Sequence, residues 1–371
     1  MKGIEIFFLV LSSMEVALVY NLKKEETELA ESDSQPSGQN ISDVSTQVQK
    51  TTIQSDTYAE WDTIETITAV RDALALRHVV TMVEANDEAY DSLKRLRPEI
   101  VFNIAEGQYG VSREAHIPAM MEMLNIPYTG SDALTLGICL DKSRAKEILS
   151  YYKIPTPKFF VLHSLNEVSS LALTLPCMVK PLYEGSSKGI FNKSLVQTRE
   201  ELMQQVETIL TTYSQPALVE EFLPGREFTV AMLGNGSDAQ VLPIVEIKFD
   251  SLPSGVNPIY SFEAKWIWDQ SDNPLDIFEC PAKVSSELKN KIEKICLDAY
   301  RVLRCRDWSR IDVRLDGQGK PHIIEINPLP GILPNIEDNS CYPKAARMAG
   351  ISYNEMLNKV LDAGCKRYGL L

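Results

Sequence analysis

The chain lacks the features that mark disulfide-rich, zinc-binding and membrane-spanning proteins. Its seven cysteines include no CxxC pair and stand apart, at positions 139, 177, 280, 296, 305, 341 and 365. This spacing offers neither a disulfide framework nor the usual set of zinc ligands. No apolar run is long enough to cross a bilayer. We therefore expect reduced thiols, a cytoplasmic location and no membrane partner.

Positive charge is also scarce. The 37 lysines and arginines are outnumbered by 51 aspartates and glutamates, which gives a net charge of −14 at pH 7. This balance argues against nucleic acid as the main partner, although local basic pockets can still bind phosphates. The 371 residues, of which 44% are hydrophobic and 24% charged, predict a globular protein of two or three domains.

The first part of the chain alternates predicted strands with predicted helices. Strands are expected near residues 15–21, 78–83, 99–105 and 126–131, and helices near 62–76, 89–96 and 114–124. This alternation indicates a parallel sheet with a binding site at the carboxyl ends of its strands. We interpret residues 1–13 as an N-terminal extension, and the polar segment 21–56 as a flexible insertion.

The rest of the chain favours an α+β arrangement. Antiparallel strands are expected over much of 217–327, after a strand at 177–181, and helices near 141–152, 198–210, 285–303 and 353–363. We expect three domains: an α/β domain over 14–140, a central unit over 141–219 and a C-terminal unit over 220–371.

Residues 310–331 hold the most informative stretch. Ile311, Val313 and Leu315 alternate with charged residues, and a turn at 316–319 leads into a second strand, so a β-hairpin is predicted. Period two places Arg310 and Asp312 on one face of the first strand. It places Glu325 and Asn327 on one face of the second, beside Ile323.

These four polar side chains could form a single patch. Two carboxylates, an amide oxygen and a guanidinium suit Mg²⁺ that carries nucleotide phosphates. The plainer alternative is a hairpin with one charged, solvated face. Pro328, Pro330 and Gly331 favour a site, because they fix an irregular backbone directly after the candidate ligands.

Several weaker motifs each allow a structural reading as well. Lys180 precedes EGSSKG, whose glycines and serines could approach phosphate oxygens, although a Gly/Ser turn beside a lysine is common. Glu220, Glu221 and Glu227 surround the turn of VEEFLPGRE, where they could bind a nucleoside or simply be solvated.

The order of the motifs is more informative than any one of them. DKSRAK, VKP, EGSSKG, VEEFLPGRE, FEAKW, RIDVRLD and EINPLPGI follow one another along the chain. In this order the chain resembles the ATP-grasp ligases, and among them the D-alanine–D-alanine ligase family. The resemblance covers residues 14–371 apart from 21–56. It implies a three-domain ATP-grasp fold with an N-terminal parallel-sheet domain.

The resemblance also implies a role for each matching residue. ATP would be bound by Lys142, Lys180, Glu184, Gly185, Ser186, Ser187, Glu220, Glu221, Leu223, Glu227 and Lys265. Two Mg²⁺ ions, with Mn²⁺ as an alternative, would be bound by Asp312, Glu325 and Asn327. Catalytic roles would fall to Arg310, Ser186 and Glu60, the last as the acid that holds the first amino group. Substrate contacts would come from Ser340, Trp266 and Glu106.

Two of these positions depart from the family pattern. Glu106 stands where a histidine is usual, and Trp266 stands where the closing loop usually has a tyrosine. Both departures concern the amino-acid substrate, whereas the residues expected around ATP match the pattern.

The resemblance implies a reaction as well. A carboxylate attacks the γ-phosphate of ATP, and an amine then attacks the acyl phosphate to form an amide. The default product is D-alanyl-D-alanine for the cell wall, made from small-molecule amino acids by a homodimer. The alternatives are a related ligase for another amino acid or amine, a nucleotide-binding regulatory protein without turnover, and a carboxylating ATP-grasp enzyme.

Overall fold

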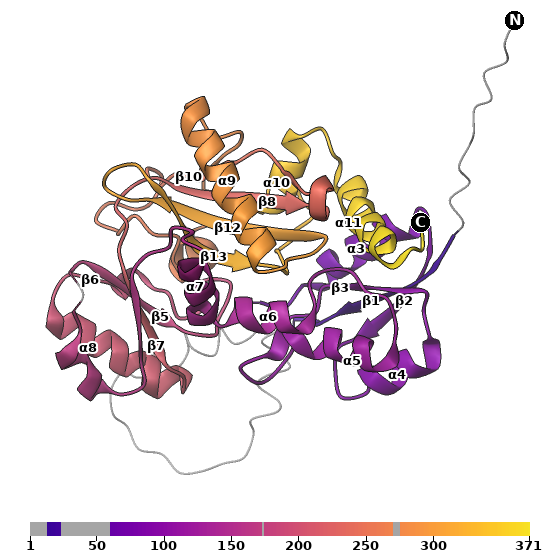
Figure 1. The fold of residues 1–371 in the computed structure, drawn as a ribbon, viewed down its shortest axis with the longest axis horizontal. Coiled ribbons are helices and arrows are strands. Elements are labelled where there is room, and N and C mark those ends of the chain that lie inside the picture. Colours follow the sequence, from indigo (N-terminus) through magenta and orange to yellow (C-terminus); the bar gives the residue numbers. More distant parts are fainter. Residues whose placement is uncertain (1–12, 24–59, 173, 270–274) are drawn as a thin grey trace, which may run out of the picture.

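The computed structural model describes residues 13–23, 60–172, 174–269 and 275–371 (Figure 1). The expected extension and insertion therefore lie almost entirely outside the described residues. Three sheets are present in the described part, and each forms the centre of one structural unit.

The N-terminal unit is built on a parallel sheet, as the alternation predicted. Its strand order is β2-β1-β3, with bounds β1 Glu15–Tyr20, β2 Val79–Glu84 and β3 Ile100–Asn103. Residues Val16 to Val19 are all buried, because helices cover both faces of such a sheet. The strand predicted at 126–131 is wrong: the segment makes a single parallel bridge, between Val101 and Tyr128.

In the described part of this unit, four helices and a short 3₁₀ turn accompany the sheet. Their bounds are α3 Ile64–Ala75, α4 Ala89–Leu96, η1 Arg113–Ala115, α5 His116–Leu124 and α6 Ala133–Leu140. The hydroxyl of Thr63 and the carboxylate of Asp132 cap α3 and α6 by accepting a backbone N–H bond. The sequence analysis did not predict α6.

The central unit is an antiparallel sheet covered by one helix. Its strand order is β4-β7-β5-β6, with bounds β4 Phe159–Leu162, β5 Cys177–Pro181, β6 Leu195–Val196 and β7 Ala217–Glu221. Helix α7 (Lys142–Tyr151) leads into the unit, and α8 (Arg199–Thr208) packs on its sheet. The boundary expected between residues 219 and 220 falls inside β7, so we propose that the central unit ends after Glu221.

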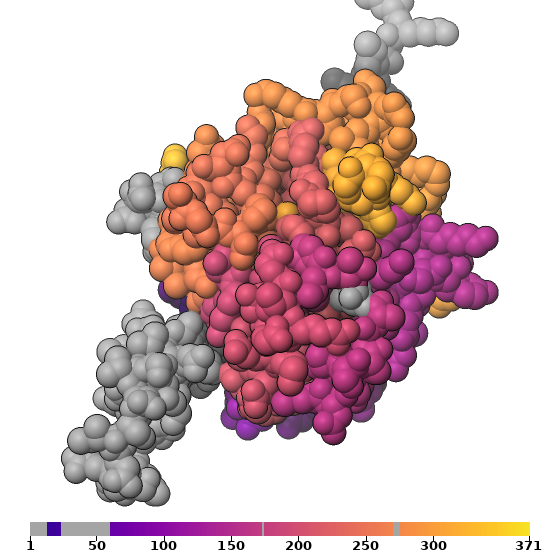
Figure 2. Space-filling view, turned by 90° about the vertical axis from the view of Figure 1, so that its left-hand side faces the viewer, coloured from indigo at the N-terminus to yellow at the C-terminus, as the bar shows by residue number. Residues whose placement is uncertain are grey.

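The C-terminal unit contains the largest sheet. Its order is β11-β10-β8-β12-β13, and β9 also pairs with β8. The strands are β8 Glu227–Leu233, β9 Gln240–Val241, β10 Val245–Ile247, β11 Phe278–Glu279, β12 Trp308–Leu315 and β13 Pro321–Asn327. The helices are α9 Ser286–Val302, α10 Cys341–Met348 and α11 Tyr353–Tyr368, and η6 (Glu263–Trp268) is one π-helical turn. Figure 2 shows this unit, largely orange, above the central unit.

The first and last parts of the chain share a core. Helix α11 packs against α3, and one apolar cluster joins β1 and β3 to Trp308 and α11. Arg77 and Asp362 add an ion pair between the two units at 3.1 Å. This packing holds the parallel sheet of the N-terminal unit against the C-terminal unit.

The structure bears on the expectations for the cysteines and for membrane-spanning helices. All seven cysteines are free. Within the described ranges, no helix combines the length and the apolar character needed to span a bilayer.

Candidate functional site

Two adjoining cavities lie where the three units meet, and together they contain every predicted site residue. The larger, of about 250 Å³, is lined by residues of all three units, among them Lys180, Glu227, Trp266 and Ser340. The smaller, of about 80 Å³, is lined by Glu106, Lys142 and Asn327 among others. Both walls include Glu60, Glu184, Gly185, Ser186, Lys265, Arg310 and Glu325.

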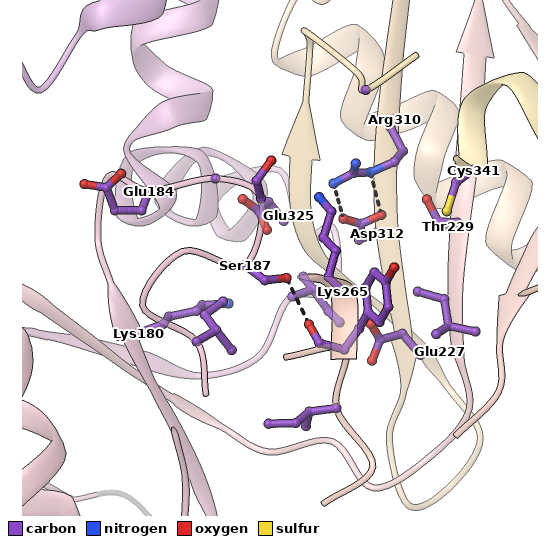
Figure 3. Close-up of a pocket in the computed structure, with 18 of the residues that line it drawn as sticks. Lys180, Glu184, Ser187, Glu227, Thr229, Lys265, Arg310, Asp312, Glu325 and Cys341 are labelled. Carbon is purple, nitrogen blue, oxygen red and sulfur yellow. Dashed lines mark hydrogen bonds and ion pairs between the residues drawn. The ribbon is translucent and has the colours of Figure 1, made fainter. Parts of the chain in front are cut away.

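The β12–β13 hairpin brings the candidate metal ligands together. Asp312 pairs with Glu325 in the register, and Arg310 pairs with Asn327. Two nitrogens of Arg310 donate to the carboxylate of Asp312 at 3.1 and 3.0 Å (Figure 3), and the amide of Asn327 donates to it at 3.3 Å. Lys142 forms an ion pair with Glu325 at 3.1 Å.

A β-bulge corrects the predicted faces of β13. Asp312 opposes Glu325 but Val313 opposes Ile323, so Ile324 has no partner in the register. The extra residue reverses the alternation. Ile323 therefore points into the core together with Ile326, and the prediction that it shares a face with Glu325 is wrong.

The carboxylate set fits a hard divalent cation that also binds phosphate. Mg²⁺ is commonly held by one or two carboxylates together with substrate phosphates and water, not by an all-protein cage. Asp312 and Glu325 supply two such carboxylates, and each is now paired with a cationic side chain. Within the described ranges, no group of three or more His, Cys, Asp or Glu side chains could hold a metal ion.

Buried ion pairs organise one end of the larger cavity. The carboxylate of Glu220 lies between Lys146, at 2.9 Å, and Lys180. Burial opposes the ionisation of Glu220, but the two lysine charges outweigh it and lower its pKa to about 2. Leu223 is buried nearby, and Glu221 lines the same cavity. Lys146 was missed, although it follows Lys142 at the i+4 spacing that places both on one helix face.

Glu227 is held by an arginine that the sequence analysis passed over. Arg314 lies opposite Glu227 across β8 and β12, and donates to its carboxylate at 2.5 Å. A second Arg314 nitrogen donates to the carbonyl of Pro258 at 2.8 Å. Arg314 is buried, with its guanidinium 4.7 Å from the centre of the Phe222 ring. Arg314 stands two residues after Asp312, a spacing that places both side chains on one face of a strand, and this was the signal that could have placed it in the site.

The Gly/Ser loop is fastened on two sides. On one side, the N–H of Gly185 donates to Glu60 at 2.5 Å. On the other, the hydroxyl of Ser187 donates to the carbonyl of Tyr260 at 2.9 Å (Figure 3), and the indole of Trp266 donates to the carbonyl of Ser186 at 3.1 Å. The tryptophan that replaces the usual tyrosine thus still reaches this serine, through its main chain.

Arg113 joins Glu60 to the same loop. One of its nitrogens donates to both oxygens of Glu60 at 2.7 Å, and the other donates to the carbonyl of Tyr183 at 2.8 Å. It also lies 3.5 Å from Glu184. Glu60, predicted to hold an amino group, is therefore already engaged by a guanidinium. Arg113 was missed, because nothing local marks an arginine that bridges segments so far apart.

Lys265 and Ser340 complete the wall of the larger cavity. Lys265 extends toward the Arg310–Asp312 pair (Figure 3). Burial lowers the pKa of Lys265 to about 8, and the charge of Arg310 adds to this effect. The hydroxyl of Ser340 accepts a bond from the N–H of Leu333 at 3.2 Å and lies at the start of α10.

Comparison with known proteins agrees with this geometry. The family model D-ala D-ala ligase C-terminus matches residues 148–362, more than half of the chain. The D-alanine–D-alanine ligase of Bordetella avium is 35% identical over 271 residues, which are 72% of this chain and 79% of that protein. The uncharacterized protein y4sG of Sinorhizobium fredii is 37% identical over 299 residues, 78% of this chain and 84% of that protein.

Two solved structures share the fold. The D-alanine–D-alanine ligase of Bacillus anthracis complexed with ATP has a TM-score of 0.64 and 22% identity, covering 96% of this chain and 99% of that chain. The VanG D-Ala:D-Ser ligase of Enterococcus faecalis has a TM-score of 0.67 and 20% identity, covering 95% and 100%.

Fold and relatives together define an ATP-grasp enzyme, a ligase that forms carbon–nitrogen bonds. Within this class, the chain belongs to the D-alanine–D-alanine ligase family, as a divergent member. The family assignment predicted from the order of the motifs is confirmed.

Proposed function

We propose that this ligase uses ATP to join the carboxyl group of one amino acid to the amino group of another. The observation that carries the proposal is the position of the Asp312–Glu325 pair and Arg310 at the junction of the two cavities. A nucleotide in the larger cavity would direct its terminal phosphate toward a carboxylate in the smaller one. D-alanyl-D-alanine for peptidoglycan is the reference product, because several relatives are named D-alanine–D-alanine ligases.

The nucleotide would occupy the larger cavity from the central unit to the hairpin. Glu220, Glu221 and Leu223 would lie beside the adenine, and Glu227 beside the ribose. The phosphates would meet Lys142, Lys180 and the loop of Glu184, Gly185, Ser186 and Ser187. Lysine side chains and main-chain amides of a glycine-rich loop are suited to such an anion.

Asp312, Glu325 and Asn327 would hold the metal, proposed as two Mg²⁺ ions with Mn²⁺ as a substitute. When bound, the ions neutralise charge on the transferring phosphate. Arg310 would stabilise the developing negative charge beside them, and Lys265 would add a second cation. Ser340 would receive the carboxylate of the second amino acid.

Exclusion of water is the second task of the site, because an acyl phosphate is readily hydrolysed. The contacts of Ser186 and Ser187 with Trp266 and Tyr260 close the Gly/Ser loop over the cavities. We propose that these contacts open to admit substrates and form again during the reaction. A cytoplasmic homodimer is part of the same proposal, and the seven free cysteines suit a reducing compartment.

The direct test measures phosphate release from Mg-ATP with D- and L-amino acids, singly and in pairs, and identifies the product by mass. Release that requires an amino acid and yields a dipeptide supports the proposal. Nucleotide binding without release under any condition would point to a regulatory protein. Release that depends on bicarbonate would point to a carboxylating enzyme.

A further inference from the structure

Three acidic side chains line the smaller cavity without a hydrogen-bond or ion-pair partner among the described residues. Asp62 precedes α3, Glu106 follows β3, and Glu114 lies in η1, all at the carboxyl edge of the parallel sheet. No hydrogen bond or ion pair to these three carboxylates is made by the residues that the structure describes. Glu114 is only 9% exposed, so water does not readily replace the missing partner.

The other carboxylates of this wall are compensated. Glu60 accepts bonds from Arg113 and Gly185, and Glu325 pairs with Lys142. Glu184 is paired with Lys188 at 3.1 Å and accepts a bond from Gln215. Of the cations that line this cavity, Lys142 is paired with Glu325 and Arg310 with Asp312, whereas Lys265, which extends toward the Arg310–Asp312 pair, makes no ion pair within the described residues. Asp62, Glu106 and Glu114 are the acids of this wall that lack an ion pair among the described residues.

Their proton affinities agree with this imbalance. Burial raises the pKa of Asp62 to about 7. Burial also raises the pKa of Glu114 to about 8, although the nearby charge of Arg113 opposes the rise. The pKa of Glu106 is raised well above its usual range by burial and then by the charges of Glu114 and Glu60. All three acids would be stabilised as carboxylates by a cation that entered the cavity.

The cation that fits is an ammonium group, not a metal ion. The three acids are not among any group in the described ranges that could hold a metal. An ammonium group has three N–H donors, which it can give to neighbouring carboxylates directly or through bridging water, so the acids need not converge on one point as metal ligands must. A cavity of about 80 Å³ has room for a few water-sized groups, which suits a short side chain.

An ordinary zwitterionic amino acid brings no net charge to this wall. Its carboxylate would face Arg310, and it offers one ammonium group to the three acids, whereas a diamino acid offers two. We propose that the carboxylate substrate is a short diamino acid, with its second ammonium group bound by Asp62, Glu106 and Glu114. This inference rests on the proposed ligase function and names the substrate class of the same site.

The test compares pairs of amino acids that differ only by an ammonium or a methyl group. These pairs are 2,3-diaminopropionate with 2-aminobutyrate, and 2,4-diaminobutyrate with norvaline, each as D and L isomers with ATP, Mg²⁺ and a fixed amine acceptor. We expect kcat/KM for the diamino acid to exceed that of its partner at least about tenfold, because a charged hydrogen bond is made in only one of them. Equal or reversed values would overturn the inference.

Variants assign the preference to the acids. Glu114→Gln and Glu106→Gln should each lower the ratio between the two amino acids severalfold, because amide groups carry no charge. Glu88→Gln, an exposed change in the same unit, is the matched control and should keep the ratio. Circular dichroism and melting temperature show whether each variant is folded. An unchanged ratio in both folded variants would also overturn the inference.

The outcomes separate the two proposals. Turnover with alanine and no preference for diamino acids would leave the ligase function in place and reject the substrate class. If nothing turns over, calorimetric binding of 2,4-diaminobutyrate and norvaline decides the matter without catalysis. Binding of the diamino acid alone, weakened by Glu114→Gln, would support the acidic subsite, and no difference would reject it.

Discussion

The side of the site proposed for the nucleotide and the side proposed for the amino acids differ in how their charges are balanced. On the nucleotide side, Glu220 lies between two lysines and Glu227 is paired with Arg314. On the amino-acid side, Glu106 and Glu114 have no partner among the described residues. The first side is balanced by the protein's own ion pairs, whereas for the second we propose that a ligand supplies the missing charge. This difference separates what is common to ATP-grasp chemistry from what selects the substrate.

The largest expected effect concerns the nucleotide side. Glu325→Gln removes one of the two carboxylates among the candidate metal ligands, so ATP-dependent phosphate release should fall at least about 1,000-fold while the fold is retained. Initial rates at saturating substrates, together with circular dichroism, measure both properties. Glu287→Gln, exposed on α9, is the control. Near-normal release by the Glu325 variant would remove this residue from the metal site.

Arg113 lies between the two sides, and its loss should lower the free energy of unfolding. Arg113→Met leaves the buried carboxylate of Glu60 without its cation, and such a break typically costs about 3–5 kcal/mol. The matched control is Arg77→Met, which breaks the more exposed pair with Asp362 and should cost about 1 kcal/mol or less. Urea unfolding measures both. If both variants lost the same free energy of unfolding, burial would not make the Arg113–Glu60 pair more stabilising than the exposed Arg77–Asp362 pair.

A pH profile sharpens the comparison at Lys265. With its pKa near 8, this lysine carries its charge below pH 8 and loses it above. If that charge serves the phosphates, kcat/KM for ATP should fall up to about tenfold per pH unit above that value. In Lys265→Arg the decline should move to higher pH, because a guanidinium stays charged. Identical profiles would exclude Lys265 as the titrating group.

The smallest effect is expected at Trp266. Trp266→Tyr should change amino-acid preference severalfold and the KM for ATP much less, since its indole contacts the loop beside the smaller cavity. Steady-state kinetics with both substrates measure the split. Trp268→Tyr changes a tryptophan two positions away that lines neither cavity, and serves as the control. Equal changes for both substrates would place Trp266 outside substrate selection.

Local patterns predicted the parts of the site that lie on regular elements. Alternation gave both strands of the β12–β13 hairpin, and strand–helix alternation gave the parallel sheet. The Arg113–Glu60 and Glu220–Lys146 pairs could not be predicted in this way, because each joins segments more than 50 residues apart. Helix α6 escaped for another reason: its residues are almost all apolar, so they show no amphipathic period.

The bulge at Ile324 has a consequence for how this protein tolerates change. Ile324, the one residue of β13 without a partner in the register, decides which side chains on either side of it face the core and which face the site. Deletion of Ile324 would leave every functional side chain in the sequence. It would, however, turn either Glu325 and Asn327 away from the site or the apolar residues before the bulge, such as Ile323, away from the core. The orientation of the site residues thus depends on the bulge in β13 as well as on which residues are present, so a one-residue deletion would disrupt the site without replacing any of its side chains.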